Sequence, residues 1–494
     1  MKKLCSVILL VCMLLFIFPS CSSNNNNGKT ENKNDGTGNA DNTAEESTVE
    51  NTTAVVKDDV PEMDLGGYNF RILSSGEPHI WHGILNVEQE TGDVVNDSIY
   101  RRDRAVESRF NIVISETYDD WNVSKLPKSV KAGSNDYDFV TGWCDPMFSH
   151  AVSGYGYKFS DYGKYIDLTK PYWDSGLTKS LTFGNEILFP AGAVDLTTYD
   201  LIHVLLFNKQ IIKDFALDDP YSIVKSGSWT FDKYDEMAKS VTKDVDGNGI
   251  MNENDMYGLV SMVKYVLPCF WISAGVESIS RTDTNLPQFT LVGDDKFATV
   301  INRIFAITYD NNSWYQDTKD LNNFSDVHNA IFMDNRALFF DSTFKMIEDV
   351  RGMNTDFGII PYPKFTAEQD NYYTRTEGCF PFIVPLTVPE PEKTGAVIEA
   401  MACETLNDVI PAYYDVSLKT KYARDDESAE MLDIIFSHRV CDLGDSIWCS
   451  TLRDGVFVKM FQKNDRNLTS NMEKVEPTIT KAINKALTAL GLAQ

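Results

Sequence analysis

The stretch from Trp229 to Leu259 constrains its local structure more tightly than any other part of this 494-residue chain. Thr230 is a good N-cap residue, and the apolar residues after it recur at the three-and-four spacing of one buried helix face. Those residues are Phe231, Tyr234, Met237, Ala238 and Val241. The pattern predicts a helix that ends at Lys243 and passes directly into a polar loop.

The polar loop has oxygen-bearing residues at fixed spacing. In a twelve-residue calcium-binding loop, positions 1, 3, 5, 9 and 12 carry side-chain oxygens, position 7 contributes its carbonyl, and a glycine at position 6 makes the sharp turn. The matching residues are Asp244, Asp246, Asn248, Gly249, Ile250, Asn252 and Asp255. Because a hard cation prefers oxygen ligands, we expect this loop to bind Ca²⁺.

Asp255 is the one departure from that pattern, since position 12 usually holds a glutamate with a longer arm. The aspartate would bind through one oxygen or through a water molecule. The alternative interpretation is a polar turn that binds no metal. There is a single loop and no second helix of a paired hand, so we expect a structural ion rather than a calcium sensor.

The N-terminus has the pattern of an exported chain. Two lysines precede an uncharged, mostly apolar run over residues 4–18, which is too short for a membrane span and typical of a signal peptide. Phe18-Pro19-Ser20-Cys21 resembles the lipobox of bacterial lipoproteins, with Phe18 in place of the usual leucine. The resemblance implies that residues 1–20 are removed and that a lipid on Cys21 anchors the chain to the bacterial cell membrane, on its extracellular side. A plain signal peptide with an accidental cysteine is the alternative.

Residues 21–60 are rich in Asn, Thr, Gly, Asp, Glu and Lys and nearly lack apolar side chains. They cannot bury enough surface to fold, so we expect a disordered tether of roughly 40 residues. The body that follows, about 435 residues long, is too large for one ordinary domain and predicts two or more lobes.

The chain is strongly acidic, with a net charge of −27. Removal of residues 1–20 would take away two lysines and no acidic residue, which leaves −29. Nucleic acid is therefore excluded as an expected partner, and anionic lipid surfaces are poor ones.

Six cysteines follow Cys21, at positions 144, 269, 379, 403, 441 and 449. Their spacing contains no C-x-x-C pair, and no histidine lies beside them in a ligand pattern, which argues against zinc. An exported chain can form disulfides, but the sequence does not pair these cysteines. Buried free thiols are equally compatible with it.

The body begins with the alternation of a parallel α/β sheet. Residues 67–73 predict a strand, a helix is expected from about Asn96 to Phe110, and residues 112–115 predict the next strand. Residues 137–141 predict another strand. Ligands bind at the carboxyl ends of strands in open α/β sheets, so Trp143 and Asp145, which follow that strand, are candidate ligand contacts.

Residues 187–190 and 202–207 also predict strands, and we expect no helix between them in residues 191–200. A chain that passes from one sheet to another without a crossover helix is how two lobes are joined by a hinge. Asp195 and Tyr199 would lie in this hinge.

The order of these segments resembles the extracellular solute-binding proteins of ABC sugar importers, the maltose-binding-protein-like family 1. The resemblance covers about residues 65–490. It is carried by residues 68–73, by 137–142 with Ser153-Gly154, by the crossover from Phe189-Pro190 to Phe207-Asn208-Lys209, by Gly227-Ser228-Trp229-Thr230 with the helix and loop that end in Tyr257-Gly258-Leu259, and by 337–341 and 357–361.

The resemblance implies a type II periplasmic-binding-protein-like α/β fold, in which two mixed sheets flanked by helices are joined by hinge strands. Lobe 1 would contain residues 61–195 and about 378–410, and lobe 2 residues 196–377 and about 411–494. A carbohydrate would be held in the cleft between the lobes, and the closed form would dock on the transmembrane subunits of an ABC permease. The protein would act as a monomer and not as an enzyme.

Proteins hold sugars with aromatic platforms against their flat C–H faces and with carboxylates or amides that bond to their hydroxyls. The candidate ligand contacts are Trp81, Trp143, Asp145, Asp195, Tyr199, Trp271, Asp341 and Phe344. By the resemblance, Asp341 falls where the family places an amide or carboxylate, and Phe344 where it often places a stacking Trp. Core packing is the competing interpretation for each single aromatic residue.

Two other functions fit the same composition. A secreted glycoside hydrolase would need two carboxylates about 5 to 9.5 Å apart, for which Asp145 and Asp341 are the candidates. The short motifs of serine hydrolases, zinc proteases and P-loop enzymes are absent from the chain. A surface glycan-binding adhesion lipoprotein would differ only in lacking a permease partner.

Overall fold

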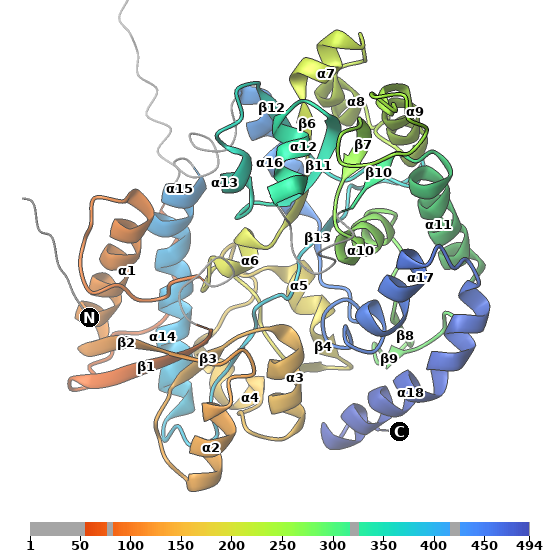
Figure 1. The fold of residues 1–494 in the computed structure, drawn as a ribbon. Coiled ribbons are helices and arrows are strands. Elements are labelled where there is room, and N and C mark those ends of the chain that lie inside the picture. Colours follow the sequence, from red (N-terminus) through yellow and green to blue (C-terminus); the bar gives the residue numbers. More distant parts are fainter. Residues whose placement is uncertain (1–54, 77–82, 317–325, 415–424, 494) are drawn as a thin grey trace, which may run out of the picture. The chain divides into compact units, whose positions relative to one another are not determined.

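The structure, a computed structural model, describes residues 55–76, 83–316, 326–414 and 425–493 (Figure 1). The predicted signal peptide, Cys21, most of the predicted tether and Trp81 therefore lie outside the described residues. Among the described residues, no helix is both long enough and apolar enough to cross a membrane.

The first sheet has four strands in the order β14-β3-β1-β2. Its strands are β1 (Tyr68–Ser75), β2 (Ile112–Asp119), β3 (Phe139–Thr141) and β14 (Phe382–Ile383). β1 pairs in parallel with both β2 and β3, whereas β14 is antiparallel to β3. Because Ser75 pairs with Asp119 and Ser74 with Thr141, the carboxyl ends of the three parallel strands meet at one edge.

Helices cover both faces of this sheet. On one face, α1 (Val94–Phe110) and α14 (Pro391–Glu404) share a hydrophobic core with alternate residues of β1 and β2, such as Ile72 and Ile114. On the other face, Leu73 belongs to a second core with residues of α2 (Lys125–Ala132) and α3 (Cys144–Val152). Successive side chains of a strand point to opposite faces of the sheet, so the neighbouring residues Ile72 and Leu73 belong to different cores.

The second sheet has five strands in the order β10-β7-β11-β6-β12. Its strands are β6 (His203–Asn208), β7 (Tyr257–Val260), β10 (Trp314–Tyr315), β11 (Ala337–Thr343) and β12 (Phe357–Ile360). β11 is parallel to β7 and antiparallel to β6, so the sheet is mixed. Every residue of β6 and β11 is buried, which accounts for their continuous apolar runs.

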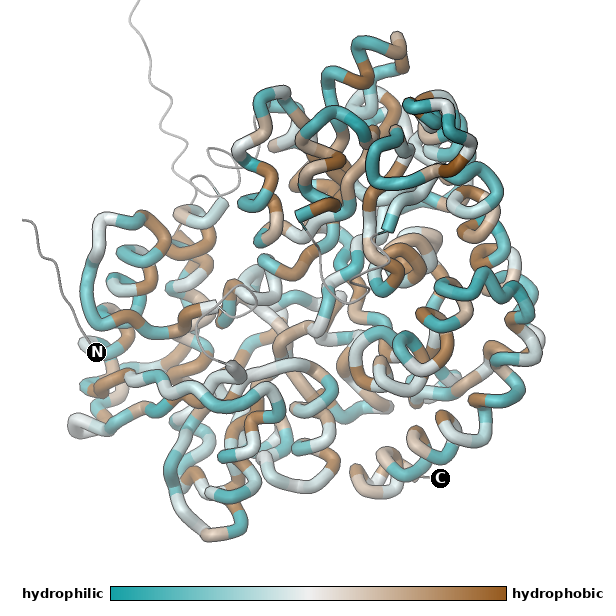
Figure 2. The backbone as a smooth tube through the Cα atoms, in the orientation of Figure 1, coloured by the Kyte–Doolittle hydropathy of each residue, from teal (hydrophilic) through white to brown (hydrophobic). Residues whose placement is uncertain are grey.

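The main helices around the second sheet are α9 (Phe231–Val241), α10 (Val263–Ser273), α11 (Asp295–Phe305), α12 (Asp326–Met333) and α16 (Asp426–Ser437). The helix predicted after Thr230 is confirmed as α9, and it ends two residues earlier than expected. α10 is buried at ten of its eleven positions, and Figure 2 shows it as hydrophobic along most of its length.

The remaining elements are short, apart from the C-terminal helix. They are α4 (Phe159–Tyr162), η1 (Gly163–Tyr165), α5 (Ser175–Ser180), β4 (Thr182–Phe183), β5 (Glu186–Ile187), α6 (Thr197–Asp200), α7 (Lys209–Asp214), α8 (Pro220–Lys225), β8 (Ser280–Arg281), β9 (Pro287–Gln288), η2 (Ala306–Asp310), α13 (Ile347–Val350), β13 (Thr374–Arg375), η3 (Thr405–Val409), α15 (Ile410–Ala412), β15 (Arg439–Val440), η5 (Arg453–Phe457), α17 (Val458–Gln462) and α18 (Leu468–Ala489).

The chain passes between the two sheets three times: from β5 to β6, from β12 to β14, and from α14 to α16. The prediction that residues 191–200 contain no helix is wrong, because α6 forms a single turn there. The Asp195 carboxylate accepts a hydrogen bond from the backbone N–H of Thr197 at 2.7 Å and so helps to start this turn. One turn is too short to leave a periodic signal in the sequence.

All strands of the first sheet come from residues predicted for lobe 1, and all strands of the second sheet come from residues predicted for lobe 2. The two regions also share part of a core: Phe148 and Phe183 pack on Trp448, with ring centroids 5.6 and 6.2 Å from it. The exact lobe boundaries stay a prediction.

One disulfide is present among the described cysteines, and it joins Cys379 to Cys441. The other four, Cys144, Cys269, Cys403 and Cys449, are buried free thiols. Both alternatives that the sequence left open therefore occur in the same chain. The disulfide lies next to β13 and β15, which pair in parallel beside the second crossing.

Candidate functional site

Two tryptophans lie at the carboxyl edge of the first sheet. Trp121 follows β2 and is 43% exposed, and Trp143 follows β3 and is half-buried. Their ring centroids are 6.1 Å apart, with the ring planes tilted by 45°. Phe380 packs on the inner ring, 4.9 Å from the centroid of Trp143. We call these three residues the aromatic platform.

Glycines allow the chain to approach this closely. A side chain at Gly142 would place its Cβ 2.8 Å from the Cβ of Ser75, so only glycine lets β3 turn toward Trp143 here. Gly378 has a φ of +72°, and a Cβ there would lie 2.3 Å from the Trp143 ring. The indole of Trp143 thus packs directly on the backbone of Gly378. The N–H of Cys144 also donates to the carbonyl of Gly378, at 3.0 Å.

Asp145, in the first turn of α3, is exposed, yet the surrounding protein desolvates its carboxyl group enough to raise its pKa. The positive charges of Arg453 and Lys264 act in the opposite direction and favour the carboxylate. Both basic residues belong to the predicted lobe 2, so Asp145 faces the second lobe.

A buried ionic network lies beyond these residues. Arg375 binds Asp445 with two parallel hydrogen bonds, from Nε at 2.6 Å and from Nη2 at 2.9 Å. Arg453 binds the same carboxylate at 3.1 Å, and Glu377 lies 3.5 Å from Arg375. Burial alone would raise the pKa of Glu377, but Arg375 and Lys264 hold that pKa well below its usual value.

His203 connects this network to the second sheet. Its Nδ1 lies 3.1 Å from the Asp341 carboxylate and its Nε2 lies 3.3 Å from Glu377. Burial and the positive charge of Arg375, whose Nη1 lies 2.7 Å from Nε2, disfavour a charged imidazole, but the neighbouring Cys269 and Asp341 outweigh these effects and raise the pKa of His203 well above its ordinary value. The network therefore has the geometry of a fixed support rather than of an open binding site.

Three of the predicted ligand contacts face the protein interior. Asp341 is fully buried, and its oxygens accept from His203 and from Ser261, the latter at 2.7 Å. Phe344 is fully buried and stacks on Phe436 at 5.4 Å. Trp271 is fully buried against Phe297 and Phe457. In this arrangement Phe344 and Trp271 pack in the protein core, as the competing interpretation expects.

Asp195 is also buried, at 4% exposure, and its carboxylate accepts from the N–H of Thr197, the first residue of α6. Tyr199, in the same turn, is partly exposed, and the guanidinium of Arg439 lies 4.7 Å from its ring centroid. Of the predicted contacts within the described residues, Trp143, Asp145 and Tyr199 are thus the ones that retain exposed surface. No comparison tests the ligand role of any of them, so these roles stay predictions.

Sequence reasoning missed Trp121 and Phe380. The strand before Trp121 was expected to end at Ser115, whereas β2 continues to Asp119 and delivers Trp121 to the same edge as Trp143. The charged and polar residues in the second half of β2 hid this extension. Phe380 could not be found from the sequence because it comes from a crossing segment more than 200 residues further along.

The candidate metal loop is closed at its base by two hydrogen bonds between the backbones of Lys243 and Met256, at 3.1 and 3.0 Å. Inside it, the Asp244 carboxylate accepts from the N–H groups of Gly247 and Gly249, both at 2.7 Å. The bond from Gly249 contributes most to lowering the pKa of Asp244. The loop therefore keeps this carboxylate ionised.

Asp255 is fully buried and points into the loop, where it accepts from the N–H groups of Val245 and Asn252, both at 2.8 Å. One ligand oxygen from each of Asp244, Asp246 and Asp255 lies within 4.8 Å of the others. The shorter arm of Asp255 thus reaches the centre of the loop. Three converging carboxylates are a donor set that suits a hard divalent cation.

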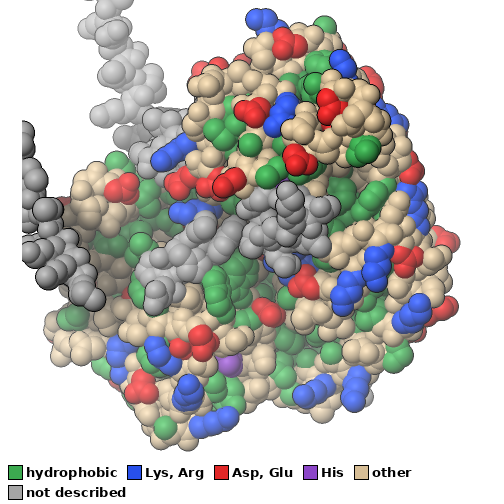
Figure 3. All heavy atoms as spheres, viewed as in Figure 1, with side chains coloured by type: hydrophobic (Ala, Val, Ile, Leu, Met, Phe, Trp, Pro, Cys, Tyr) green, Lys and Arg blue, Asp and Glu red, His purple; other side chains and the backbone are tan. Residues whose placement is uncertain are grey.

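The surface shown in Figure 3 carries acidic and basic side chains in alternation, with hydrophobic side chains gathered between the upper and lower parts of this face. No large single-sign patch is visible among the described residues on this face. On this face the acidic side chains are thus dispersed, as is typical of a solvated surface.

No protein-family model matches the sequence, and no curated protein matches it. Solved structures do match. An ABC substrate-binding protein from Listeria monocytogenes in complex with cycloalternan aligns with a TM-score of 0.53 at 12% identity, over 84% of this chain and 99% of that one. The maltose/maltodextrin-binding domain MalE from Bdellovibrio bacteriovorus, bound to maltotriose, aligns with a TM-score of 0.51 at 15% identity and the same coverage.

A sugar transporter protein from Rhizobium etli in an open conformation aligns with a TM-score of 0.57 at 13% identity, over 84% of this chain and 99% of that one. The chain therefore has the two-lobed α/β fold of solute-binding proteins, with mixed sheets flanked by helices. The expected fold class is confirmed.

Asp200, next to Tyr199, provides a test of the hinge turn. Burial raises the pKa of Asp200 to about 6, although Lys345 and the hydroxyl of Tyr413, 2.7 Å away, favour the ionised form. Because the folded pKa lies above the usual 3.8, this group's contribution to stability is full below that pH and is lost as the pH rises through about 6.

We therefore expect Asp200→Asn to raise the melting temperature relative to wild type more at pH 7.5 than at pH 4. The amide can still accept from Tyr413 and never has to carry a buried charge. Thermal melts of both proteins across this pH range measure the effect. Asp283→Asn, a change at an exposed acid, is the control. A difference between the two proteins that does not depend on pH would contradict the prediction.

Proposed function

We propose that this protein is the substrate-binding component of an ABC importer and that it captures a mono- or oligosaccharide between its lobes for delivery to a membrane permease. The observation that carries the proposal is the aromatic platform at the carboxyl edge of the first sheet, with an indole that is 43% exposed. The fold supports it, because the Listeria and Bdellovibrio proteins of this fold were solved with a bound carbohydrate.

The platform suits the chemistry of a sugar. A pyranose ring has a flat C–H face that packs on an indole, and hydroxyls that donate to a carboxylate. Trp121 and Trp143 would supply the first contact and Asp145 the second. Lys264, which is partly exposed, would approach the same ligand from lobe 2, so that contacts made by both lobes favour the closed form. The protein would act as a monomer, and the closed form is what the permease would recognise.

Two observations argue against a glycoside hydrolase. Asp341, one of the two candidate carboxylates, is fully buried and engaged with His203 and Ser261, so it is not free to act on a ligand beside Asp145. The solved proteins of this fold quoted above are binding or transport proteins. We therefore propose that the ligand is bound and released unchanged. An adhesion lipoprotein would use the same platform and would differ only in having no permease.

Substitutions in the platform test this proposal. We expect Trp143→Ala and Trp121→Ala each to weaken binding of the best sugar in a glycan screen by about tenfold or more, since each removes a large stacking surface. Phe215→Ala, which removes an exposed aromatic residue that directly follows α7, is the matched control and should leave binding unchanged. Isothermal titration calorimetry measures the dissociation constants.

A wild-type protein that binds no sugar in a broad screen would contradict the carbohydrate proposal. Incubation of the bound sugar with the protein for hours, followed by chromatography, tests the absence of hydrolysis. Appearance of shorter products would favour the enzyme instead.

We also propose that residues 244–255 hold a structural calcium ion. Asp244, Asp246, Asn248, Asn252 and Asp255 would provide side-chain oxygens and Ile250 its carbonyl. The bound cation would offset the repulsion between the three carboxylates that converge in the loop. It would also fix the connection between α9 and β7, and so the start of an inner strand of the second sheet.

Removal of calcium should lower the melting temperature, and added calcium should restore it, because an ion that binds only the folded state stabilises it by mass action. Asp244→Asn should remove most of this response, whereas Asp283→Asn, at an exposed acid outside the loop, should retain it. Differential scanning calorimetry with chelator and with calcium measures both effects. An identical melt of wild type under the two conditions would contradict the proposal.

For the N-terminus we propose cleavage after residue 20 and lipidation of Cys21, which would tether the protein to the outer side of the cell membrane. The sequence from Phe18 to Cys21 and the polar segment after it support this proposal. We expect wild type expressed in a bacterial host to incorporate labelled fatty acid and to fractionate with membranes, and Cys21→Ser to do neither. Cys403→Ser, at a buried thiol, is the control. Equal labelling of wild type and Cys21→Ser would contradict the assignment.

A further inference from the structure

The Cys379–Cys441 disulfide lies directly beside the aromatic platform. Cys379 stands between Gly378, on which the Trp143 ring rests, and Phe380, which packs on the same ring. Trp143 therefore contacts the residues on both sides of the half-cystine. Any change in the backbone at Cys379 moves two of the surfaces that hold this indole.

The backbone at this point adopts a conformation that ordinary residues avoid. Gly378 has a φ of +72° and Cys379 has a φ of +45°, so two consecutive residues are left-handed. Such a conformation is disfavoured for a residue with a side chain, and it persists only where the surrounding structure imposes it. The pairing of β13 with β15 ends just before it, at the hydrogen bond from the N–H of Thr376 to Val440.

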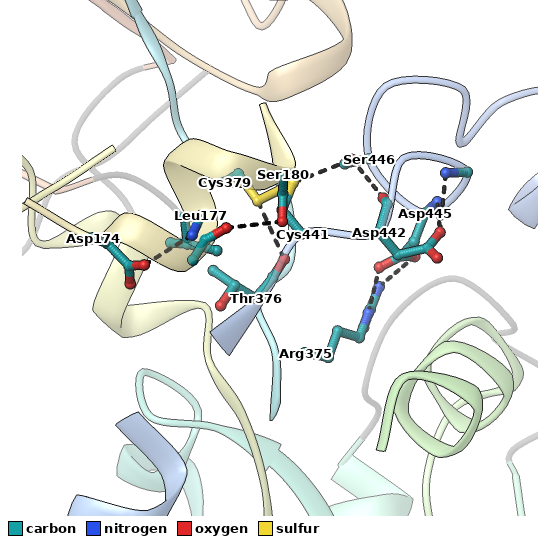
Figure 4. The surroundings of a disulfide bond; sticks show 12 residues. Asp174, Leu177, Ser180, Arg375, Thr376, Cys379, Cys441, Asp442, Asp445 and Ser446 are labelled. Atoms are coloured by element: carbon teal, nitrogen blue, oxygen red, sulfur yellow. Dashed lines mark hydrogen bonds and ion pairs between the residues drawn. A yellow bond between two sulfur atoms is a disulfide. The ribbon is translucent and has the colours of Figure 1, made fainter. Parts of the chain in front are cut away.

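The other half of the disulfide is rigidly held. Cys441 directly follows β15 and precedes Asp442, a buried carboxylate that accepts from the N–H groups of Ser278 at 2.7 Å and of Gly444 and Asp445 at 3.0 Å. Asp445 in turn binds the buried Arg375. Figure 4 shows the disulfide lying between α5 and this group of hydrogen-bonded residues. Cys441 is therefore a fixed point to which Cys379 is tied.

We propose that the Cys379–Cys441 disulfide is a positioning device for the ligand site: it holds Gly378 and Phe380 in the strained turn that supports Trp143. Without the disulfide, the backbone dihedral angles of residues 376–380 relax toward the right-handed region, and the Trp143 indole loses the surface of Gly378 and Phe380 on which it packs. This inference rests on the proposed function, in that the platform is taken as the place where the ligand binds.

A purely stabilising cross-link would behave differently. A disulfide that closes a loop of 62 residues restricts the unfolded chain and so raises stability whatever it touches in the folded state. Its loss would lower the melting temperature and leave the affinity of the folded protein unchanged. Affinity, measured well below the melting temperature, therefore separates the two roles.

The double variant Cys379→Ala/Cys441→Ala tests the proposal. We expect its dissociation constant for the sugar that wild type binds to rise by roughly tenfold, a loss comparable with removal of a stacking residue. Its near-ultraviolet circular dichroism should lose the contribution of Trp143, obtained as the difference between each protein and its Trp143→Phe derivative. Cys403→Ala, which removes a buried free thiol from α14, is the control and should change neither quantity.

A second variant, Gly378→Ala, disturbs the contact between Gly378 and the Trp143 ring while the disulfide stays intact. Gly378→Ala places a methyl group 2.3 Å from the Trp143 ring and should weaken binding to a similar degree. If the disulfide variant melts at a lower temperature but binds as tightly as wild type, the positioning role is overturned. If wild type binds no sugar, the proposed function fails, and the circular dichroism decides the inference alone. An unchanged Trp143 contribution in the disulfide variant would then overturn it.

Discussion

A buried ion pair between Arg375 and Asp445 holds the segments that pass between the two sheets. Arg375 follows β12 along the second crossing, and Asp445 lies beyond β15, so the pair ties the crossing to the C-terminal part of the chain. Both side chains are almost fully buried. Removing one partner of such a pair leaves an uncompensated charge in the interior, which costs about 3–5 kcal/mol.

The Arg375–Asp445 ion pair also helps to position the candidate ligand site. Next along the chain from Arg375 come Glu377, which faces His203 and Lys264, then Gly378 under Trp143 and Phe380 beside it. One short segment therefore links the ionic network, the disulfide and the aromatic platform. Polar groups that satisfy one another in this way cost desolvation energy, but they specify a single arrangement of the crossing, which apolar packing alone would leave less defined.

Much of the first sheet and of the candidate metal loop could be predicted because both depend on residues close together in the sequence. The strand predicted at 67–73, the helix predicted from about Asn96 to Phe110 and the helix after Thr230 follow from hydrophobic periodicity and, for the last, from its N-cap residue, and they correspond to β1, α1 and α9. The ligand candidates were harder. Asp341, Phe344 and Trp271 have side chains of the right kind, but whether such a side chain faces solvent or core depends on elements that pack over it from elsewhere in the chain.

The sequence by itself determined the local features: the alternation of strands and helices, and the loop of oxygen-bearing residues at fixed spacing. Each of these follows from residues within about a dozen positions of one another. Only the tertiary structure decided which aromatic residues meet at the sheet edge, which cysteines pair, and which carboxylates are buried. Those outcomes bring together Trp121, Trp143 and Phe380, or Cys379 and Cys441, from segments far apart in the sequence. Hydrophobic spacing predicts which face of an element is buried, but whether a single aromatic or acidic side chain is covered depends on such distant contacts.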